Sequence, residues 1–315
     1  MIQFTNKAQT LLDLREQVKS AKIPKTQTVL FRDWKNARQE VVASLTKAFS
    51  ANCVFAVRSS ATNEDSQDES MAGKYLSLLN IEVDALDSAI DEVFASYDTQ
   101  DLSEIVLIQE MVSNVVLSGV AFSHDPSNCS PYRVINWSET SDTSYVTSGK
   151  GGKTWRYSGK KPKYIVPPAK LDKVVALLEE LLSIFNQPLD IEFALTETSG
   201  ELTLWLLQAR PLVLSQKPFS EEQLYQRLSL IHDYIDQKLK PHPLLLGKRS
   251  LFGVMPDWNP AEIIGVRPKP LALSLYKEMV TNAIWAYQRH NYGYRNLRSF
   301  PLMQHFSGLP YIDVR

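Results

Sequence analysis

The clearest alternation of hydrophobic and polar residues lies in the segment LDIEFALTETSGELTLWLLQARP, residues 189–211. A period of two predicts a strand with Asp190 and Glu192 on one side and apolar residues on the other, namely Ile191, Phe193 and Leu195. On the strand that follows, one side is expected to hold Leu202, Leu204, Leu206, Gln208 and Arg210. A three-residue loop, Thr198 to Gly200, suits a hairpin closed by a bulge and would place Asp190 roughly opposite Gln208. The pattern therefore predicts a β-hairpin that separates a core face from a polar face.

Apolar runs and helical spacing predict the other elements. Residues 53–57 suit a strand buried on both faces, and residues 104–126 are typical of two strands joined by a short turn. The strongest helical spacing of apolar residues runs from Leu171 to Phe185. Further helices are expected within residues 220–240 and 271–290. We therefore predict an α+β protein, with a first domain at residues 1–214 and a mainly helical region at residues 215–315.

Composition narrows the class of protein. The 315 residues are 44% hydrophobic with a formal net charge of -1, which allows a sizeable core and favours no polyanionic partner. Aromatic and arginine residues at 285–298 can stack on bases, but at this net charge we expect helix packing and no nucleic-acid binding. Without an apolar run of about 18 residues or a signal-peptide core, we expect a cytoplasmic protein with no membrane span. The two cysteines, Cys53 and Cys129, predict neither a disulfide framework nor a metal site.

The polar residues of the predicted hairpin suit a metal and phosphate site. Mg²⁺ prefers hard oxygen ligands, typically one or two carboxylates with phosphate oxygens, and Glu192 with the Gln208 amide oxygen can supply them. Arg210 offers the planar fork that binds phosphate. An ordinary edge hairpin, with its charged residues paired across the strands, would show the same pattern.

A second polar group follows the strand predicted at residues 53–57. Arg58 leaves the end of this strand, and one phosphate there can bind both its guanidinium and the hydroxyls of Ser59, Ser60 and Thr62. Gly73 lies among small residues that let backbone amides approach a phosphate. The acidic run between them, residues 64–69, is equally consistent with a solvated loop.

The end of the strand at residues 104–112 is a candidate site for a base. Adenine needs a backbone donor and a backbone acceptor along its edge and apolar groups on its faces. The segment Gln109, Glu110, Met111 and Val112 can provide both. Ordinary core strands fit these residues as well.

Four motifs resemble, in order and spacing, the N-terminal ATP-grasp domain of the pyruvate phosphate dikinase and phosphoenolpyruvate synthase family. They are VRSSATNEDSQDESMAGKYLSLLN, IQEMV, SGVAFSHDP, and DIEF followed by LQARP. The resemblance covers residues 1–214 and implies a two-lobed ATP-grasp fold that binds ATP and Mg²⁺. It also implies that Arg58 and Arg210 hold phosphates and take part in catalysis, and that Glu192 and Gln208 hold magnesium with Asp190 beside them.

Two segments depart from the family pattern. The N-terminus lacks the family's two opening glycines but keeps the lysine-to-leucine spacing, so Lys7 is the candidate phosphate-binding lysine. Thr5 or Asn6 can cap a helix there, where an anion would favour a lysine in the first turn; a solvated surface lysine is the alternative. Residues 145–159 can form a lid that brings Lys150 or Lys153 to phosphates, or a surface hairpin.

The resemblance implies the ATP-binding module of a phosphoenolpyruvate-synthase-like phosphotransferase. Mg-ATP would donate phosphate to a histidine on a phosphohistidine-carrying domain that is not recognisable in this sequence, so we expect a fragment of a longer protein. None of the five histidines has the family's catalytic context, although His124 would lie near the nucleotide. The final acceptor would be pyruvate, or an antibiotic or glucan as in other relatives. A non-catalytic ATP-binding regulatory module is the alternative function.

Overall fold

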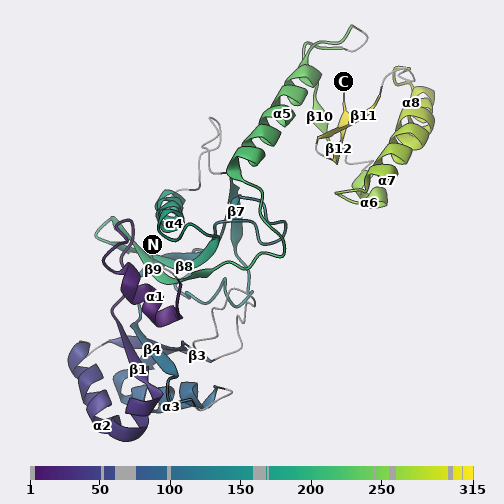
Figure 1. The fold of residues 1–315 in the computed structure, drawn as a ribbon. Helices are drawn as coiled ribbons and strands as arrows, with labels where there is room; N and C mark the ends of the chain where they lie inside the picture. Colours follow the sequence, from purple (N-terminus) through teal and green to yellow (C-terminus); the bar gives the residue numbers. More distant parts are fainter. Residues whose placement is uncertain are drawn as a thin grey trace. The chain divides into compact units, whose positions relative to one another are not determined.

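A computed structural model describes residues 4–50, 53–60, 76–97, 101–158, 168, 170–243, 246–254, 260–296, 301–306 and 308–314 (Figure 1). The chain divides into two compact units, Met1–Glu221 and Glu222–Arg315. The boundary expected near residue 215 lies in the connection between the last strand of the first unit and the long helix that begins at Glu221.

The first unit contains a four-stranded antiparallel sheet in the order β1-β4-β2-β3. Its strands are β1 (Thr26–Leu30), β2 (Val54–Ser59), β3 (Ser77–Glu82) and β4 (Ile105–Glu110). Helices α2 (Phe31–Ala48) and α3 (Leu86–Ala95) pack on it, with the short helix η1 (Val83–Ala85) before α3. Apolar residues at helical spacing explain the burial of one face of α3, namely Leu86, Ala89, Ile90, Val93 and Phe94.

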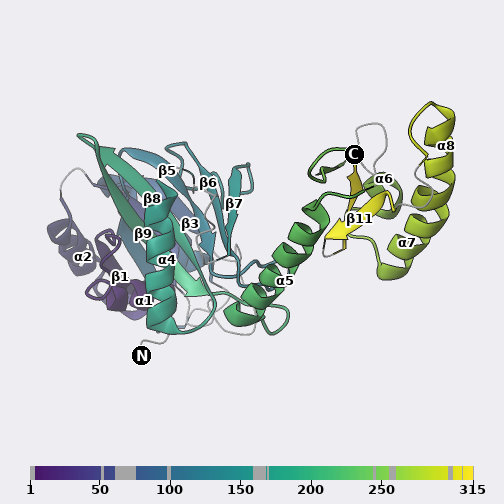
Figure 2. The same ribbon diagram turned by 90° about the horizontal axis from the view of Figure 1, so that it is seen from above.

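A five-stranded antiparallel sheet follows, in the order β7-β6-β5-β8-β9. Its strands are β5 (Val115–Phe122), β6 (Arg133–Ser138), β7 (Lys153–Tyr157), β8 (Leu189–Thr198) and β9 (Glu201–Pro211). Helices α1 (Lys7–Leu14) and α4 (Leu171–Phe185) share its apolar core, and Figure 2 shows α4 against the sheet. The helix predicted at residues 171–185 is confirmed with the same bounds.

The two strands predicted within residues 104–126 belong to different sheets. β4 is an inner strand of the first sheet, and β5 is an inner strand of the second. The segment 111–114 between them therefore passes from one lobe to the other, with Asn114 at a positive φ of 57°. The predicted α+β class with two lobes is confirmed.

The β8–β9 hairpin corrects the predicted register. Its turn has two residues, Ser199 and Gly200, both with positive φ, as the tightest hairpin turns require. Farther along, β9 carries one extra residue, Leu207, in a bulge beside Glu192. Asp190 consequently lies opposite Arg210 rather than Gln208, while Glu192 lies opposite Gln208.

The same bulge corrects the predicted faces of the hairpin. Ile191, Phe193 and Leu195 join the core as expected, together with Leu204 and Leu206. Gln208 does not share their side. Because Leu207 adds one residue, the alternation is reset, and Gln208 and Arg210 point with Glu192 into a cavity.

The second unit is mainly helical, as predicted. After α5 (Glu221–Leu239) come α6 (Pro260–Ile264), α7 (Pro270–Leu275), the π-helix η2 (Tyr276–Trp285) and α8 (Ala286–Asn291). A small sheet in the order β10-β12-β11 was not predicted; its strands are β10 (Phe252–Gly253), β11 (Met303–Phe306) and β12 (Leu309–Asp313). Among the described residues of the whole chain, no helix is long and apolar enough to span a membrane.

Candidate functional site

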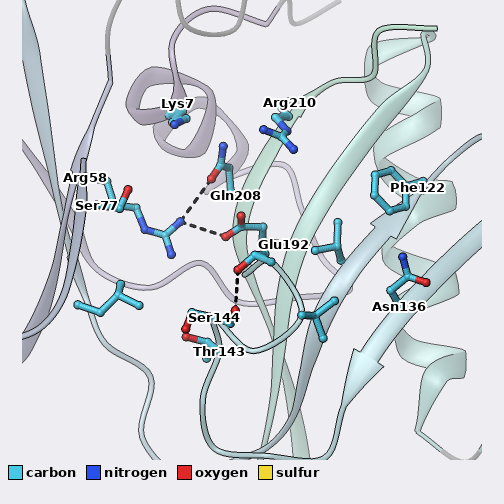
Figure 3. A pocket seen from close by; sticks show the side chains of 14 residues that line it. Lys7, Arg58, Ser77, Phe122, Asn136, Thr143, Ser144, Glu192, Gln208 and Arg210 are labelled. Atoms are coloured by element: carbon cyan, nitrogen blue, oxygen red, sulfur yellow. Dashed lines mark hydrogen bonds and ion pairs between the residues drawn. The ribbon is translucent and has the colours of Figure 1, made fainter. Parts of the chain in front are cut away.

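A cavity of about 530 Å³ lies on the polar side of the β8–β9 hairpin (Figure 3). The four-stranded sheet contributes Arg58, Ser77 and Leu79. The five-stranded sheet contributes Val120, Phe122, Asn136, Glu192, Gln208 and Arg210. Lys7 comes from the start of α1, and a loop adds Thr143, Ser144, Val146 and Thr147. Both lobes therefore build one site, and five of the predicted site residues lie in it.

Arg58 connects the lobes at the centre of this cavity. Its Nη1 donates to Glu192 Oε2 at 3.1 Å and to Gln208 Oε1 at 3.3 Å. The Arg58 side chain is only 12% exposed, and its buried Nε–H has no hydrogen-bond partner among the described residues. A buried donor without a partner is costly, so this guanidinium is suited to an additional acceptor such as a phosphate oxygen.

Glu192 and Gln208 fit a magnesium ion in the kind and direction of their oxygens. Both oxygens bond to the same nitrogen of Arg58, so they converge on one region of the cavity. A carboxylate and an amide oxygen are hard donors of the kind that Mg²⁺ takes. The described residues contain no cluster of three or more His, Cys, Asp or Glu that could hold a metal. Phosphate oxygens and water would therefore have to complete the coordination.

Asp190 supports Arg210 and does not line the cavity. The Arg210 Nε donates to both carboxylate oxygens, at 2.7 and 3.0 Å. Burial raises the pKa of Asp190 above its ordinary value of 3.8, although the charge and hydrogen bonds of Arg210 oppose this shift. Since the pair sits in register across β8 and β9, Asp190 holds the Arg210 guanidinium in place at the edge of the cavity.

Lys7 reaches the cavity from the first residue of α1. As the sequence predicted, this helix is capped: the Asn6 side chain accepts a hydrogen bond from the Gln9 amide at 2.8 Å. The preceding amide, that of Ala8, donates to Ser60 Oγ at 3.0 Å. The start of α1 is thereby tied to the segment that carries Arg58.

The residues predicted to hold adenine lie elsewhere. Glu110, Met111 and Val112 line a second cavity of about 650 Å³, next to Trp205 and Thr196. The Gln109 side chain is buried and donates to the Leu207 carbonyl at 3.2 Å. The amides of Glu110 and Met111 already donate to the carbonyls of Lys25 and Val54.

Four other positions considered from the sequence have different outcomes. Gly73 lies outside the described residues. Lys150 and Lys153 do not line the phosphate cavity; they pair with Asp142 at 3.5 Å and Glu139 at 2.9 Å. His124 is also absent from the lining, and burial together with Arg133 lowers its pKa.

Sequence reasoning missed four polar residues of the cavity lining, which come from β6 and the loop after it. Asn136, Thr143, Ser144 and Thr147 are common residue types in strands and loops, and no motif marks them. The apolar residues Val134, Ile135 and Trp137 could have indicated a strand, but only strand pairing through β5 brings Asn136 to the face that carries Glu192.

Comparisons with known proteins found a family similarity for the N-terminal part of the chain. Residues 5–151 match the family model of the pyruvate phosphate dikinase AMP/ATP-binding domain. Phosphoenolpyruvate synthase of Escherichia coli (strain K12) is 40% identical over 106 residues, which cover 29% of this chain and 13% of the synthase. The predicted resemblance is thus confirmed for this part of the chain.

Solved structures with similar backbones were also found. D-Alanine-D-alanine ligase from Helicobacter pylori has a TM-score of 0.36 and 16% identity, covering 66% of this chain and 51% of the ligase. The protein PH1788 from Pyrococcus horikoshii Ot3 has a TM-score of 0.39 and 11% identity, covering 67% of this chain and 93% of its own.

Proposed function

From the match of residues 5–151 to the AMP/ATP-binding domain of pyruvate phosphate dikinase, we propose that this chain binds Mg-ATP as the nucleotide module of a phosphoenolpyruvate-synthase-like phosphotransferase. The observation that carries the proposal is the bonding of Arg58 to Glu192 and Gln208 in a cavity that Lys7 and Arg210 also line. Three cations and two converging oxygens are a suitable set for a polyphosphate with its metal.

In this proposal each side chain has a distinct task. Glu192 and Gln208 would hold Mg²⁺, which neutralises phosphate charge when bound. Arg58, Arg210 and Lys7 would bind phosphate oxygens, and Asp190 would keep the Arg210 fork oriented. Because phosphoryl transfer needs positioning and charge stabilisation more than covalent help from the protein, such a set is sufficient for the donor half of the reaction.

The adenine base would extend toward residues 111–114, the segment that passes from one lobe to the other. Both cavities open on the same side of the β8–β9 hairpin, one beside Glu192 and Gln208 and the other beside Thr196 and Trp205. Ala194 and Leu207 form an apolar patch between them, next to Val112. With the amides of Glu110 and Met111 already bonded, Val112 is the remaining residue of the predicted segment to donate to adenine.

The acceptor of the phosphate would be supplied from outside this module. The aligned segment spans 13% of the synthase, and we propose that a phosphohistidine-carrying domain, on the same or another polypeptide, receives phosphate from the bound ATP. Pyruvate would be the final acceptor in that scheme.

Calorimetric titration of ATP, with and without Mg²⁺, tests the nucleotide site. Saturable binding that requires Mg²⁺ is expected in the wild-type chain and should be lost in Glu192→Ala and Arg210→Ala. Arg38→Ala is the matched control, because Arg38 forms ion pairs with Asp87 and Asp91 away from the cavity. Equal affinity in the wild type and both site variants would refute the assignment.

A further inference from the structure

A row of side chains crosses the five-stranded sheet beneath the cavity. Strand pairing joins Gln208 to Glu192, Glu192 to Val120, Val120 to Asn136, and Asn136 to Thr154. Residues paired directly across neighbouring strands point to the same face of a sheet. The row therefore begins with the proposed metal ligands, reaches the Asn136 amide two strands beyond Glu192, and ends at the Thr154 hydroxyl.

The Asn136 amide has a defined orientation. Thr154 Oγ1 donates to Asn136 Oδ1 at 2.8 Å, which assigns the oxygen to Thr154 and leaves the Nδ2 hydrogens for the cavity. The strand that carries Asn136 is held closely as well. A Cβ on Gly119 of β5 would lie 2.0 Å from the Asn136 carbonyl oxygen, so only glycine permits this approach.

The surroundings of Asn136 differ from those of the metal ligands. In Figure 3, Arg58 and Lys7 lie on the opposite side of Glu192 from Asn136. Three hydroxyl side chains also line the cavity, those of Thr143, Ser144 and Thr147, and Figure 3 shows Thr143 and Ser144 below Glu192. Asn136 is thus a neutral donor on the side of the cavity away from Arg58 and Lys7.

Strand spacing determines which part of a ligand Asn136 can reach. Neighbouring strands lie roughly 4.8 Å apart, so Asn136 on β6 is about 10 Å from Glu192 on β8 at the level of the backbone. A metal held by Glu192 and Gln208 would bind one part of a phosphate chain, and the amide would reach oxygens farther along it.

We propose that Asn136 is a further nucleotide-binding residue, donating from Nδ2 to a phosphate oxygen at the end of the chain remote from the metal. Thr154 is its positioning residue. This inference rests on the proposed function, because it requires a polyphosphate nucleotide in the cavity. The proposed contact is made by an uncharged side chain that lies outside the four sequence motifs.

Binding of ATP, ADP and AMP to Asn136 variants tests the contact. Asn136→Ala should weaken binding of Mg-ATP by about 10- to 100-fold, the usual range for a hydrogen bond to a charged group. The effect should be smaller for ADP and absent for AMP. Asn136→Asp should weaken ATP binding further, because it places a carboxylate beside phosphate. An equal loss for ATP and AMP would overturn the phosphate assignment.

Variants of Thr154 distinguish loss of the hydrogen bond to Asn136 from loss of the folded structure. Thr154→Val keeps the shape but removes the hydroxyl, and should weaken ATP binding, whereas Thr154→Ser should restore it. Circular dichroism melts confirm that the compared variants are folded. If the wild type binds Mg-ATP and Asn136→Ala and Thr154→Val bind it equally well, the inference is wrong and the proposed function stands. If the wild type binds no ATP, both are wrong.

Discussion

Arg58 and a metal ion compete for the same oxygens, which leads to a counterintuitive prediction. The Arg58 Nη1 bonds both Glu192 Oε2 and Gln208 Oε1, so a cation that takes these oxygens must displace the guanidinium. Nucleotide phosphates offer Arg58 a replacement partner, but a metal ion alone does not. Metal binding should therefore be weak without nucleotide, and Arg58→Met should strengthen it.

The expected gain in metal affinity can be estimated from the bond between Arg58 and Glu192. A hydrogen bond between charged groups contributes roughly 1.5–3 kcal/mol, and the Arg58–Glu192 bond is of this kind. The Glu192 side chain is 26% exposed, so solvent screening favours the lower part of this range. Since about 1.4 kcal/mol corresponds to a factor of ten, Arg58→Met should raise metal affinity about tenfold.

Electron paramagnetic resonance titration with Mn²⁺ in the absence of nucleotide measures the affinity directly. Arg58→Met should bind Mn²⁺ more tightly than the wild type and bind Mg-ATP less tightly. Glu192→Gln should bind Mn²⁺ poorly in either background. Arg38→Met, which loses two surface ion pairs instead, is the control and should behave as the wild type. Unchanged or weaker Mn²⁺ binding by Arg58→Met would refute the competition.

Two further predictions concern stability. Burial and Arg133 lower the pKa of His124 from its ordinary value of 6.5, while Glu221 acts in the other direction. The unfolded chain therefore binds a proton at His124 more readily than the folded chain does. The free energy of unfolding, measured by urea titration, should fall as pH drops below 6.5. His124→Gln should lose this part of the pH dependence. Gly119→Ala should destabilise the first unit by several kcal/mol, because its Cβ would meet backbone atoms at 2.0 and 2.8 Å. Gly200→Ala, with open space but a φ of 82°, should cost only about 1–2 kcal/mol; equal losses in the two variants would contradict the packing argument.

Local patterns predicted the elements of the site better than their arrangement. Helix α4 could be predicted because its apolar residues repeat at helical spacing and face one core. The Asn6 cap was likewise predictable, since it depends on a few neighbouring residues, whereas the strand predicted to end at residue 57 continues through Arg58 to Ser59. Glu192 was predicted to face away from the core because β8 alternates regularly on both sides of it.

The arrangement depends on contacts between distant segments. Asn136 lies in the cavity because β6 pairs with β5 and β5 with β8, an order that no local pattern specifies. The small sheet of the second unit has strands of two to five residues, too short to give a clear alternation. The segment from Gln109 to Val112 was correctly predicted to end a strand. The amides of Glu110 and Met111, however, donate to the carbonyls of distant residues, Lys25 and Val54.

The bulge at Leu207 accommodates one extra residue and keeps Gln208 on the cavity face, which can be tested by deletion. Removing Leu207 leaves Leu206 directly before Gln208, so a regular strand would still point Leu206 to the core and Gln208 to the cavity. The deletion should cost roughly 2–4 kcal/mol through the lost packing against Val115 and Ala194, yet retain Mg-ATP binding. Deleting Thr203 is the control. That change lies in the unbulged part of β9, where it exchanges the faces of the residues around it and should abolish binding. Loss of ATP binding in a folded Leu207 deletion would show that the bulge itself, and not only the alternation, positions Gln208.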